Sequence, residues 1–241
     1  MKASPRQQTL LLNLQDLDTL LARLRRRREQ LPERAQLVTI DGRAADAKSE
    51  FMAVQRERDT QKAEIDRLES DVATVQQRIE RDDQLLAVST SAKEAQAIEG
   101  ELEVLRRRKS ELEDRELELM ETDEQAAKRF DAAAGRLSEI DQERAALAAE
   151  LAAGEREIDR EIAEATEERA GLSAEVQGDL REHYEQLRAR HGIAVARLRG
   201  NVSEASNMEL APAELAAVRE VPADELAYCP QSGAILVRVD E

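Results

Sequence analysis

The sequence predicts a mainly α protein, in which a long antiparallel coiled-coil hairpin precedes a small C-terminal α+β module. Residues 37–86 and 95–158 both carry apolar side chains at the alternating three- and four-residue spacing of a coiled-coil seam. The composition agrees, because 37% of residues are charged and 2% are aromatic, which is typical of long exposed helices. Between the two seams, Ser89-Thr90-Ser91 supplies a reversal, with Ser91 and Glu94 spaced as a capping box.

A first helix is predicted ahead of the hairpin, beginning at Ser4 and Pro5, where the serine caps and the proline loses no hydrogen bond. Leucines continue at seam spacing from Leu10 to Leu31. Extra leucines at positions 11, 12 and 20 widen this face, so a further element must pack on it. Pro32 should bend or break the helical path, because it removes a donor and clashes with the preceding turn.

Matching the two seams predicts a specific register. Large side chains then face small ones, as close packing favours, with Phe51 opposite Ala126. The other layers include Ile79 with Ile98 and Ile65 with Leu112. The same register pairs opposite charges at five flanking positions: Arg78 with Glu101, Asp71 with Arg108, Glu64 with Arg115, Glu69 with Arg106, and Lys62 with Glu113. Each exposed pair contributes only about 0.2–1 kcal/mol, so the pairs indicate register and not stability.

Beyond Ile158 the seam spacing slips by one residue, and a last helix follows through Val176, Leu180, Tyr184 and Leu187. This helix is predicted to cover the broad leucine face of the first helix. Residues 1–192 should therefore form a kinked antiparallel coiled-coil hairpin with a three-helix base. Residues 193–241 change character and predict a separate module, with a helix at Pro212–Glu220 and a strand at Ile235–Val239.

Charge and cysteine content exclude several classes of protein. The net charge of -16 argues against a general nucleic-acid coat, because phosphate binding relies on cations, although a local basic patch stays open. The single cysteine excludes an intramolecular disulfide framework. No stretch has the apolarity of a signal peptide or a membrane span, so we expect a cytoplasmic protein without membrane contact.

Three motifs carry a resemblance to a known family: Leu31-Pro32-Glu33, the charged run from Leu105 to Asp114, and the tail from Cys229 to Arg238. With them, the chain resembles bacterial C4-type zinc-ribbon proteins that have a long N-terminal coiled-coil hairpin. The resemblance implies two Cys-x-x-Cys knuckles around one structural zinc. Its four ligand positions fall at Ser203, Ser206, Cys229 and Ser232.

Serine replaces cysteine at three of these four positions, and a serine hydroxyl is a poor zinc ligand. The sequence therefore predicts a degenerate zinc-ribbon-like module that has lost its metal and uses no cofactor. Natural loss and an engineered change would give the same sequence. Hydrogen bonds among Ser203, Ser206 and Ser232 should replace the metal, together with apolar packing of Met208, Leu210, Leu215, Val218, Leu226, Tyr228 and Ile235.

Catalysis has little support. Cys229 could act as a nucleophile only if His183 or His191 lay beside it, and a solvated or structural role for these side chains is the simpler interpretation. The nine glycines are scattered and form no phosphate-binding loop. We expect a protein that is not an enzyme.

Two functions stay open. The first is a non-enzymatic adaptor that binds other proteins through its coiled coil and its metal-free module. The resemblance implies such partners, since the family has members connected to RNA, to an alternative sigma factor, and to export or motility machinery. The second is an RNA- or DNA-binding regulator acting through the basic base of the hairpin, with Arg188, Arg190, Arg197 and Arg199 as contacts. The sequence does not fix the oligomeric state.

Overall fold

The computed structural model describes residues 1–238, which form two compact units. Met1–Arg34 and the chain from Ala149 onward make up the base unit, and Ala35–Ala148 make up the hairpin unit. This division differs from the predicted boundary between residues 1–192 and 193–241. That residues 193–241 form a separate domain stays a prediction. Val239, the predicted end of the last strand, lies outside the described residues.

The main helices are α1 (Pro5–Glu29), α2 (Pro32–Val88), α3 (Ala92–Glu175) and α4 (Gly178–His191). The predicted start of α1 is confirmed, because the Ser4 hydroxyl accepts a hydrogen bond from the Gln7 amide at 3.3 Å. The predicted interruption is also confirmed, since α1 ends before Leu31 and α2 begins at Pro32. Residues 89–91 reverse the chain, and the Ser91 hydroxyl accepts a hydrogen bond from the Glu94 amide at 3.5 Å.

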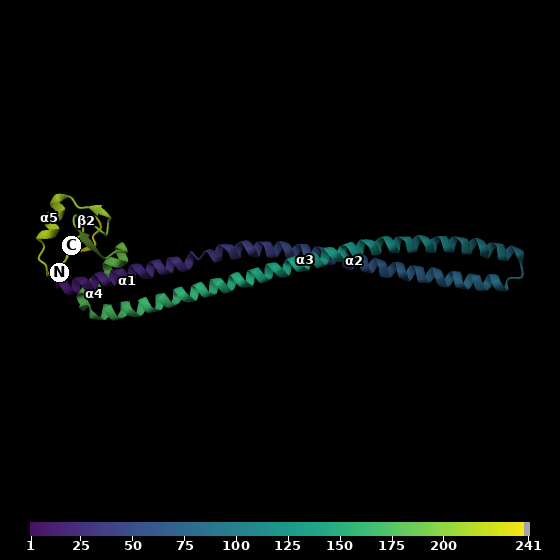
Figure 1. The fold of residues 1–241 in the computed structure, drawn as a ribbon, viewed down its shortest axis with the longest axis horizontal. Coiled ribbons are helices and arrows are strands. Elements are labelled where there is room, and N and C mark those ends of the chain that lie inside the picture. The colour runs from purple at the N-terminus through teal and green to yellow at the C-terminus, as the bar shows by residue number, and fades with distance from the viewer. Residues whose placement is uncertain (239–241) are drawn as a thin grey trace. The chain divides into compact units, whose positions relative to one another are not determined.

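In the hairpin unit, α2 and α3 run antiparallel as a coiled-coil pair, as the sequence predicts (Figure 1). The seam includes a tilted aromatic pair, Phe51 and Phe130, with ring centroids 4.9 Å apart. The Arg58 guanidinium lies 5.4 Å from the Phe130 ring centroid and also forms an ion pair with Asp123. Most of the remaining buried seam side chains are aliphatic: Ile40, Ala47, Val54, Leu68, Ile79, Leu102, Leu112, Ala126, Ala133 and Ile140.

The predicted register is wrong. Phe51 packs on Phe130 and not opposite Ala126, so the two rings meet each other. Arg106 forms its ion pair with Asp83 instead of Glu69. Arg108 pairs with Glu111 on its own helix. None of the five predicted ion pairs forms in this fully described unit, because a shifted register keeps the same apolar pattern while exposed pairs contribute too little to oppose the shift.

The base unit contains a five-stranded sheet of order β3-β2-β1-β5-β4. Its strands are β1 (Val195–Arg199), β2 (Val202–Ser203), β3 (Met208–Glu209), β4 (Ala227–Tyr228) and β5 (Ile235–Arg238). Strands β1 and β5 are parallel, and the other neighbours are antiparallel. Helix α5 (Pro212–Glu220) has the bounds that its proline and acidic first turn predict.

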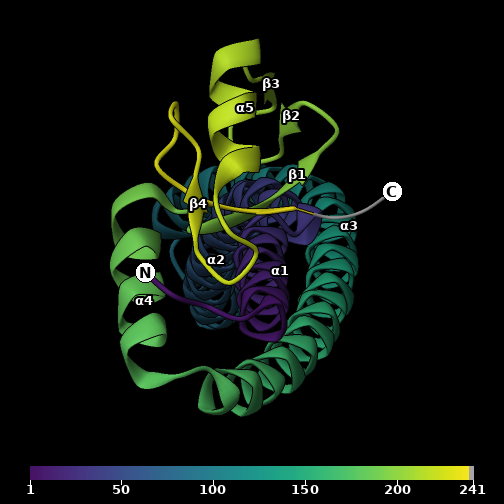
Figure 2. The same cartoon turned by 90° about the vertical axis from the view of Figure 1, so that its left-hand side faces the viewer.

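The two faces of this sheet pack against different helices. Val195, Ile235 and Val237 join the leucines of α1 in one cluster. The alternate residues Leu198 and Leu236 join α5 in another cluster. Strand periodicity explains this separation, and Figure 2 shows α1 and α5 on opposite sides of the strands. The predicted contact of Val176, Leu180, Tyr184 and Leu187 with the leucine face of α1 is confirmed.

The first residues of the chain complete this module, which the sequence does not predict. The Ala3 amide donates to the Asp224 carbonyl at 2.7 Å, and the Leu226 amide donates to the Met1 carbonyl at 3.1 Å. Lys2 and Glu225 form the antiparallel bridge between them. The N-terminal segment therefore pairs with the chain just ahead of β4.

Candidate functional site

The four predicted ligand positions lie in two turns with matching backbone geometry. Ser203 ends β2, and its carbonyl accepts a hydrogen bond from the Asn207 amide at 2.8 Å. Cys229 follows β4, and its carbonyl accepts from the Gly233 amide at 2.9 Å. Asn207 and Gly233 both adopt positive φ, 53° and 73°, in the left-handed region that asparagine and glycine tolerate best. The two turns thus share one closing hydrogen bond and one left-handed residue.

Two of the three serines, Ser203 and Ser232, bond to the Cys229 side chain. The Ser203 hydroxyl donates to the Cys229 sulfur at 3.5 Å, and both side chains are buried. The Ser206 hydroxyl instead donates to the Gln231 side-chain oxygen at 3.1 Å, which joins the two turns. The Ser232 hydroxyl accepts from the Ala234 amide at 3.4 Å. The predicted bonding of the three serines to one another is therefore wrong, since each has another partner.

The predicted apolar packing is correct in part. Leu210, Val218, Leu226 and Ile235 are buried, and Leu215 packs partly buried against the same clusters. Met208 is 56% exposed and Tyr228 is 38% exposed, so neither belongs to the core. Met208 and Tyr228 lie on two-residue strands, and the sequence of so short a strand does not show which of its side chains faces the core.

The chemistry of the donor set does not fit a structural zinc ion. Burial alone would raise the pKa of the Cys229 thiol, but hydrogen bonds from Ser203 and Ser232 hold that pKa below its ordinary value. One polarised thiol and three hydroxyls do not make the four soft or imidazole donors of a tetrahedral site. Across residues 1–238, no group of three or more His, Cys, Asp and Glu side chains is placed to hold a metal ion. The loss of zinc stays a prediction.

Neither histidine lies in a nucleophilic pair with Cys229. The His183 Nε2 atom is 2.9 Å from the Tyr228 hydroxyl. His191 packs against Gly233, where a Cβ atom would come within 3.6 Å of its ring. The hydrogen bonds of the Cys229 side chain come from serine instead. Within the described residues, neither histidine forms a hydrogen bond with the Cys229 sulfur.

A buried charged cluster joins three helices of the base unit, and sequence reasoning missed it. Asp18 of α1 is only 7% exposed and accepts hydrogen bonds from Arg169 of α3 at 2.7 Å and from the Tyr184 hydroxyl of α4 at 2.6 Å. Arg188 lies 3.2 Å from the same carboxylate, and Glu185 bonds both arginines. The sequence signal that could have revealed this cluster is Asp18, an acidic residue among the leucines of the buried face of α1.

Opposing effects set the ionisation of this cluster. Burial alone would raise the pKa of Asp18, but hydrogen bonds from Arg169 and Tyr184 and the charges of Arg169 and Arg188 lower that pKa below its usual value. Burial and the neighbouring Asp18 raise the pKa of Tyr184. Because every member has a partner, the cluster can hold helices together but offers no free group for binding.

Three of the four predicted nucleic-acid contacts are engaged within the protein. Arg188 pairs with Asp18 and Glu185. Arg197 forms two hydrogen bonds with Asp16, and Arg199 pairs with Glu204 at 3.1 Å. Arg190 is exposed and forms no ion pair with the described residues. The structure thus brings Arg197 and Arg199 together on one strand, but beside carboxylates.

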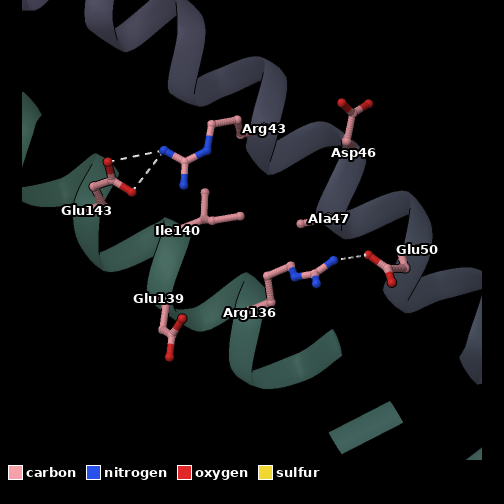
Figure 3. Close-up of a pocket in the computed structure, with 8 residues that line it drawn as sticks. All are labelled: Arg43, Asp46, Ala47, Glu50, Arg136, Glu139, Ile140 and Glu143. Atoms are coloured by element: carbon pink, nitrogen blue, oxygen red, sulfur yellow. Dashed lines mark hydrogen bonds and ion pairs between the residues drawn. The ribbon is translucent and has the colours of Figure 1, made fainter. Parts of the chain in front are cut away.

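The hairpin unit presents two kinds of surface. On one side, Arg43 pairs with Glu143 and Arg136 pairs with Glu50, and these pairs flank the buried Ala47 and Ile140, as Figure 3 shows. That shallow groove has a volume of about 440 Å³. A second groove, of about 640 Å³, lies between residues 69–76 of α2 and residues 109–117 of α3.

Comparison with known proteins defines the family. A family profile described as "CT398-like coiled coil hairpin domain" matches residues 14–192. The chain belongs to the CT398-like coiled-coil hairpin family. The match covers α1 from residue 14 together with α2, α3 and α4, and it ends ahead of β1, which begins at Val195.

Relatives of this family resemble the chain over nearly its whole length. Rv2229c of Mycobacterium tuberculosis is 32% identical over 241 residues, which is all of this chain and 98% of that protein. A solved structure from Mycobacterium smegmatis is 30% identical, has a TM-score of 0.90 and covers 99% of this chain and 100% of its own. CT398 of Chlamydia trachomatis is 20% identical with a TM-score of 0.68, over 97% of this chain and 98% of its own, and supports the fold alone.

Proposed function

We propose that this member of the CT398-like family is a non-enzymatic adaptor that binds other proteins through its hairpin unit and its metal-free turns. The observation that carries the proposal is the set of large apolar side chains that the hairpin unit leaves exposed outside its seam: Val38, Met52, Leu85, Val88, Val104, Leu117 and Met120. Leu117 and Met120 are neighbours on one face of α3, and adjacent exposed apolar side chains on a helix offer contact area to a further helix.

The chemistry of the two turns supports a role in recognition over catalysis. Cys229 and Ser203 are buried and bonded to each other, so neither is presented to a substrate. Met208 and Tyr228 are exposed on the same module and offer apolar and aromatic contact area. No helix within residues 1–238 has both the length and the apolar character needed to cross a bilayer.

Nucleic-acid binding is the second candidate, favoured by the exposed Arg190 and by the cationic strand β1. Phosphate contacts would have to displace the carboxylates that hold Arg188, Arg197 and Arg199. This competition adds a cost to binding, and the net charge of -16 repels a polyanion.

One experiment separates the two candidates. The full chain is immobilised and incubated with lysate of a bacterium that carries it, with and without nuclease, over a salt series. An adaptor retains the same proteins after nuclease treatment and at moderate salt. Loss of every partner on nuclease treatment, together with direct binding to purified RNA or DNA that weakens steeply with salt, would favour the second candidate.

A further inference from the structure

The groove between residues 69–76 and 109–117 differs from the rest of the hairpin surface. Its apolar lining consists of Val72 and Ala73 of α2 and Leu117 of α3. Leu117 is 59% exposed, and Met120, one turn further along α3, is also exposed. The two-helix seam thus leaves apolar atoms uncovered at this level.

The seam is also weak at this level, which explains why the groove forms. Lys109 and Glu116 occupy positions where the repeat calls for apolar residues, and both are only half-buried. Val72 and Val75 are likewise half-buried although they lie on the seam. Charged seam residues hold their ends toward water and keep the facing valines from closing fully.

Ion pairs recur along the opposite side of the coil, whereas on the groove side the interhelical pair Arg106–Asp83 lies nearer the turn, outside the groove. Arg43–Glu143, Arg136–Glu50 and Arg129–Glu57 each join residues that directly precede a seam position, at intervals of seven along both helices. Glu69, Gln76 and Glu113 directly follow seam positions and therefore flank the other side. Within the hairpin unit, the ion pair of the groove residues is Lys109–Glu113, which stays on α3.

The charge around the groove selects the partner. Four carboxylates line it, on Glu69, Glu113, Asp114 and Glu116, against the single ammonium of Lys109. Because Lys109 is already paired with Glu113, three carboxylates lack a cation in the groove. A docking segment must bring apolar side chains for Val72 and Leu117 and cations for the rim.

We propose that this groove binds one amphipathic helix of a protein partner, with an apolar stripe that packs on Val72, Ala73 and Leu117 and with Lys or Arg on both flanks. The proposal rests on the adaptor function and names the surface and the chemistry of the partner. The groove spans nine residues of α3, which corresponds to about 12 Å of helix. The partner therefore contributes two to three helical turns. Its helix would be the third beside α2 and α3 and would complete a local three-helix seam.

Three synthetic peptides of about 18 residues test this chemistry. The first has leucines at helical stripe spacing and lysines on the flanks. The second keeps the leucines and replaces lysine with glutamate, and the third keeps the lysines and replaces leucine with glutamine. Fluorescence anisotropy with the full-length protein should show binding of the first peptide alone. Equal binding of the lysine–glutamine peptide would mean charge attraction without a groove and would overturn the proposal.

Two matched variants locate the site. Leu117→Ser removes an exposed apolar side chain of the groove lining, and Val104→Ser removes a side chain of similar exposure, 62%, on the same helix outside the groove. Leu117→Ser should weaken binding of the first peptide by roughly tenfold or more, since a leucine loses its burial, while Val104→Ser should change it less than twofold. Equal effects of the two substitutions would refute the site.

A parallel capture distinguishes this proposal from the adaptor function. Wild-type and Leu117→Ser chains with identical thermal unfolding are used as baits in the same lysate. Loss of a protein partner from the Leu117→Ser bait supports the groove. If both baits retain the same proteins, the groove proposal fails and the adaptor function stands. If the wild-type chain retains no protein, the adaptor function fails, and the peptide measurements still decide what the groove binds.

Discussion

Asp18 is the residue at which three helices of the base unit meet. Its carboxylate is bonded by Arg169 from α3 and by Tyr184 from α4, so one side chain fixes two neighbours. Buried charge of this kind is costly to leave unpaired, which makes the cluster sensitive to loss of one member. The cluster therefore contributes more to the position of α4 than an exposed ion pair could.

Asp18→Asn should destabilise the protein by about 2 kcal/mol, because Arg169 and Tyr184 lose a buried anionic acceptor. Urea unfolding of both chains measures the difference. Asp41→Asn is the matched control, since Asp41 is half exposed and bonds Arg144 at the surface. The control should cost less than about 1 kcal/mol. Equal losses in the two variants would contradict a special role for Asp18.

The pH dependence of the same variant has a defined sign. The pKa of Asp18 is lower in the folded chain than in the unfolded chain, so its stabilisation is complete above the unfolded value and disappears as pH falls through the folded value. The difference in unfolding free energy between wild type and Asp18→Asn should therefore be constant near neutral pH and shrink below about pH 4. A difference that grows on acidification would refute this assignment.

The two turns around Cys229 lead to a prediction about metal. Purified wild-type protein should contain less than one zinc per chain, and a chelator should leave its melting temperature unchanged, because hydroxyls replace three thiolates. The triple variant Ser203→Cys, Ser206→Cys and Ser232→Cys is the control. It should gain zinc and a chelator-sensitive melting temperature. One tightly held zinc in each wild-type chain would contradict the prediction.

At the scale of elements, the sequence predicts most helix bounds because their signals are local. Ser4, Pro32, Ser91 and Pro212 each act on their own turn of chain, and each marks a helix start that the structure contains. Register depends on contacts between distant residues, and a repeating apolar pattern fits several alignments. The rings of Phe51 and Phe130 meet because alignment is set by the whole seam, not by one favourable layer.

A double-mutant cycle tests the observed register. Phe51→Ala, Phe130→Ala and the double variant should give a coupling energy of about 0.5–1.5 kcal/mol in chemical unfolding, as expected for contacting rings. The pair Phe51→Ala and Leu119→Ala, on the same two helices, should be additive within about 0.5 kcal/mol. Additivity of the two phenylalanine substitutions would show that the rings do not touch.

At the scale of the whole chain, the candidate site was only partly visible in the sequence. Ser203 and Cys229 were placed in one cluster by the resemblance, and the structure brings them within 3.5 Å. The buried hydrogen bonds of Asp18, Gln8 and Gln15 were not predicted. Most of their partners lie far away in the sequence, and the leucine pattern around these polar residues does not identify them. Gln15 accepts from the Ala194 amide at 2.7 Å, and Gln8 donates to the Ala3 and Ala223 carbonyls. Gln15 thus holds α1 to the start of β1, and Gln8 holds it to the N-terminal segment and to the loop ahead of β4.

Removal of Met1–Ala3 should destabilise the base unit by about 2 kcal/mol, because the Asp224 carbonyl and the Leu226 amide lose their partners and the buried Ala3 is lost. Hydrogen exchange should show faster exchange at Leu226 in the shortened chain. Lys2→Ala keeps the backbone bridge and changes only an exposed side chain, so it should leave exchange unaltered. Unchanged exchange after the deletion would contradict the pairing.

The pairing of Met1–Ala3 with residues 224–226 also orders events during synthesis. Met1–Ala3 leave the ribosome before residues 224–226 have been synthesised. At a translation rate of about 5–20 residues per second, tens of seconds or less separate the synthesis of the two segments. During that interval the leucines of α1 have no sheet to cover them, so the nascent chain exposes an apolar helix face. The base unit can close only when its final strands emerge.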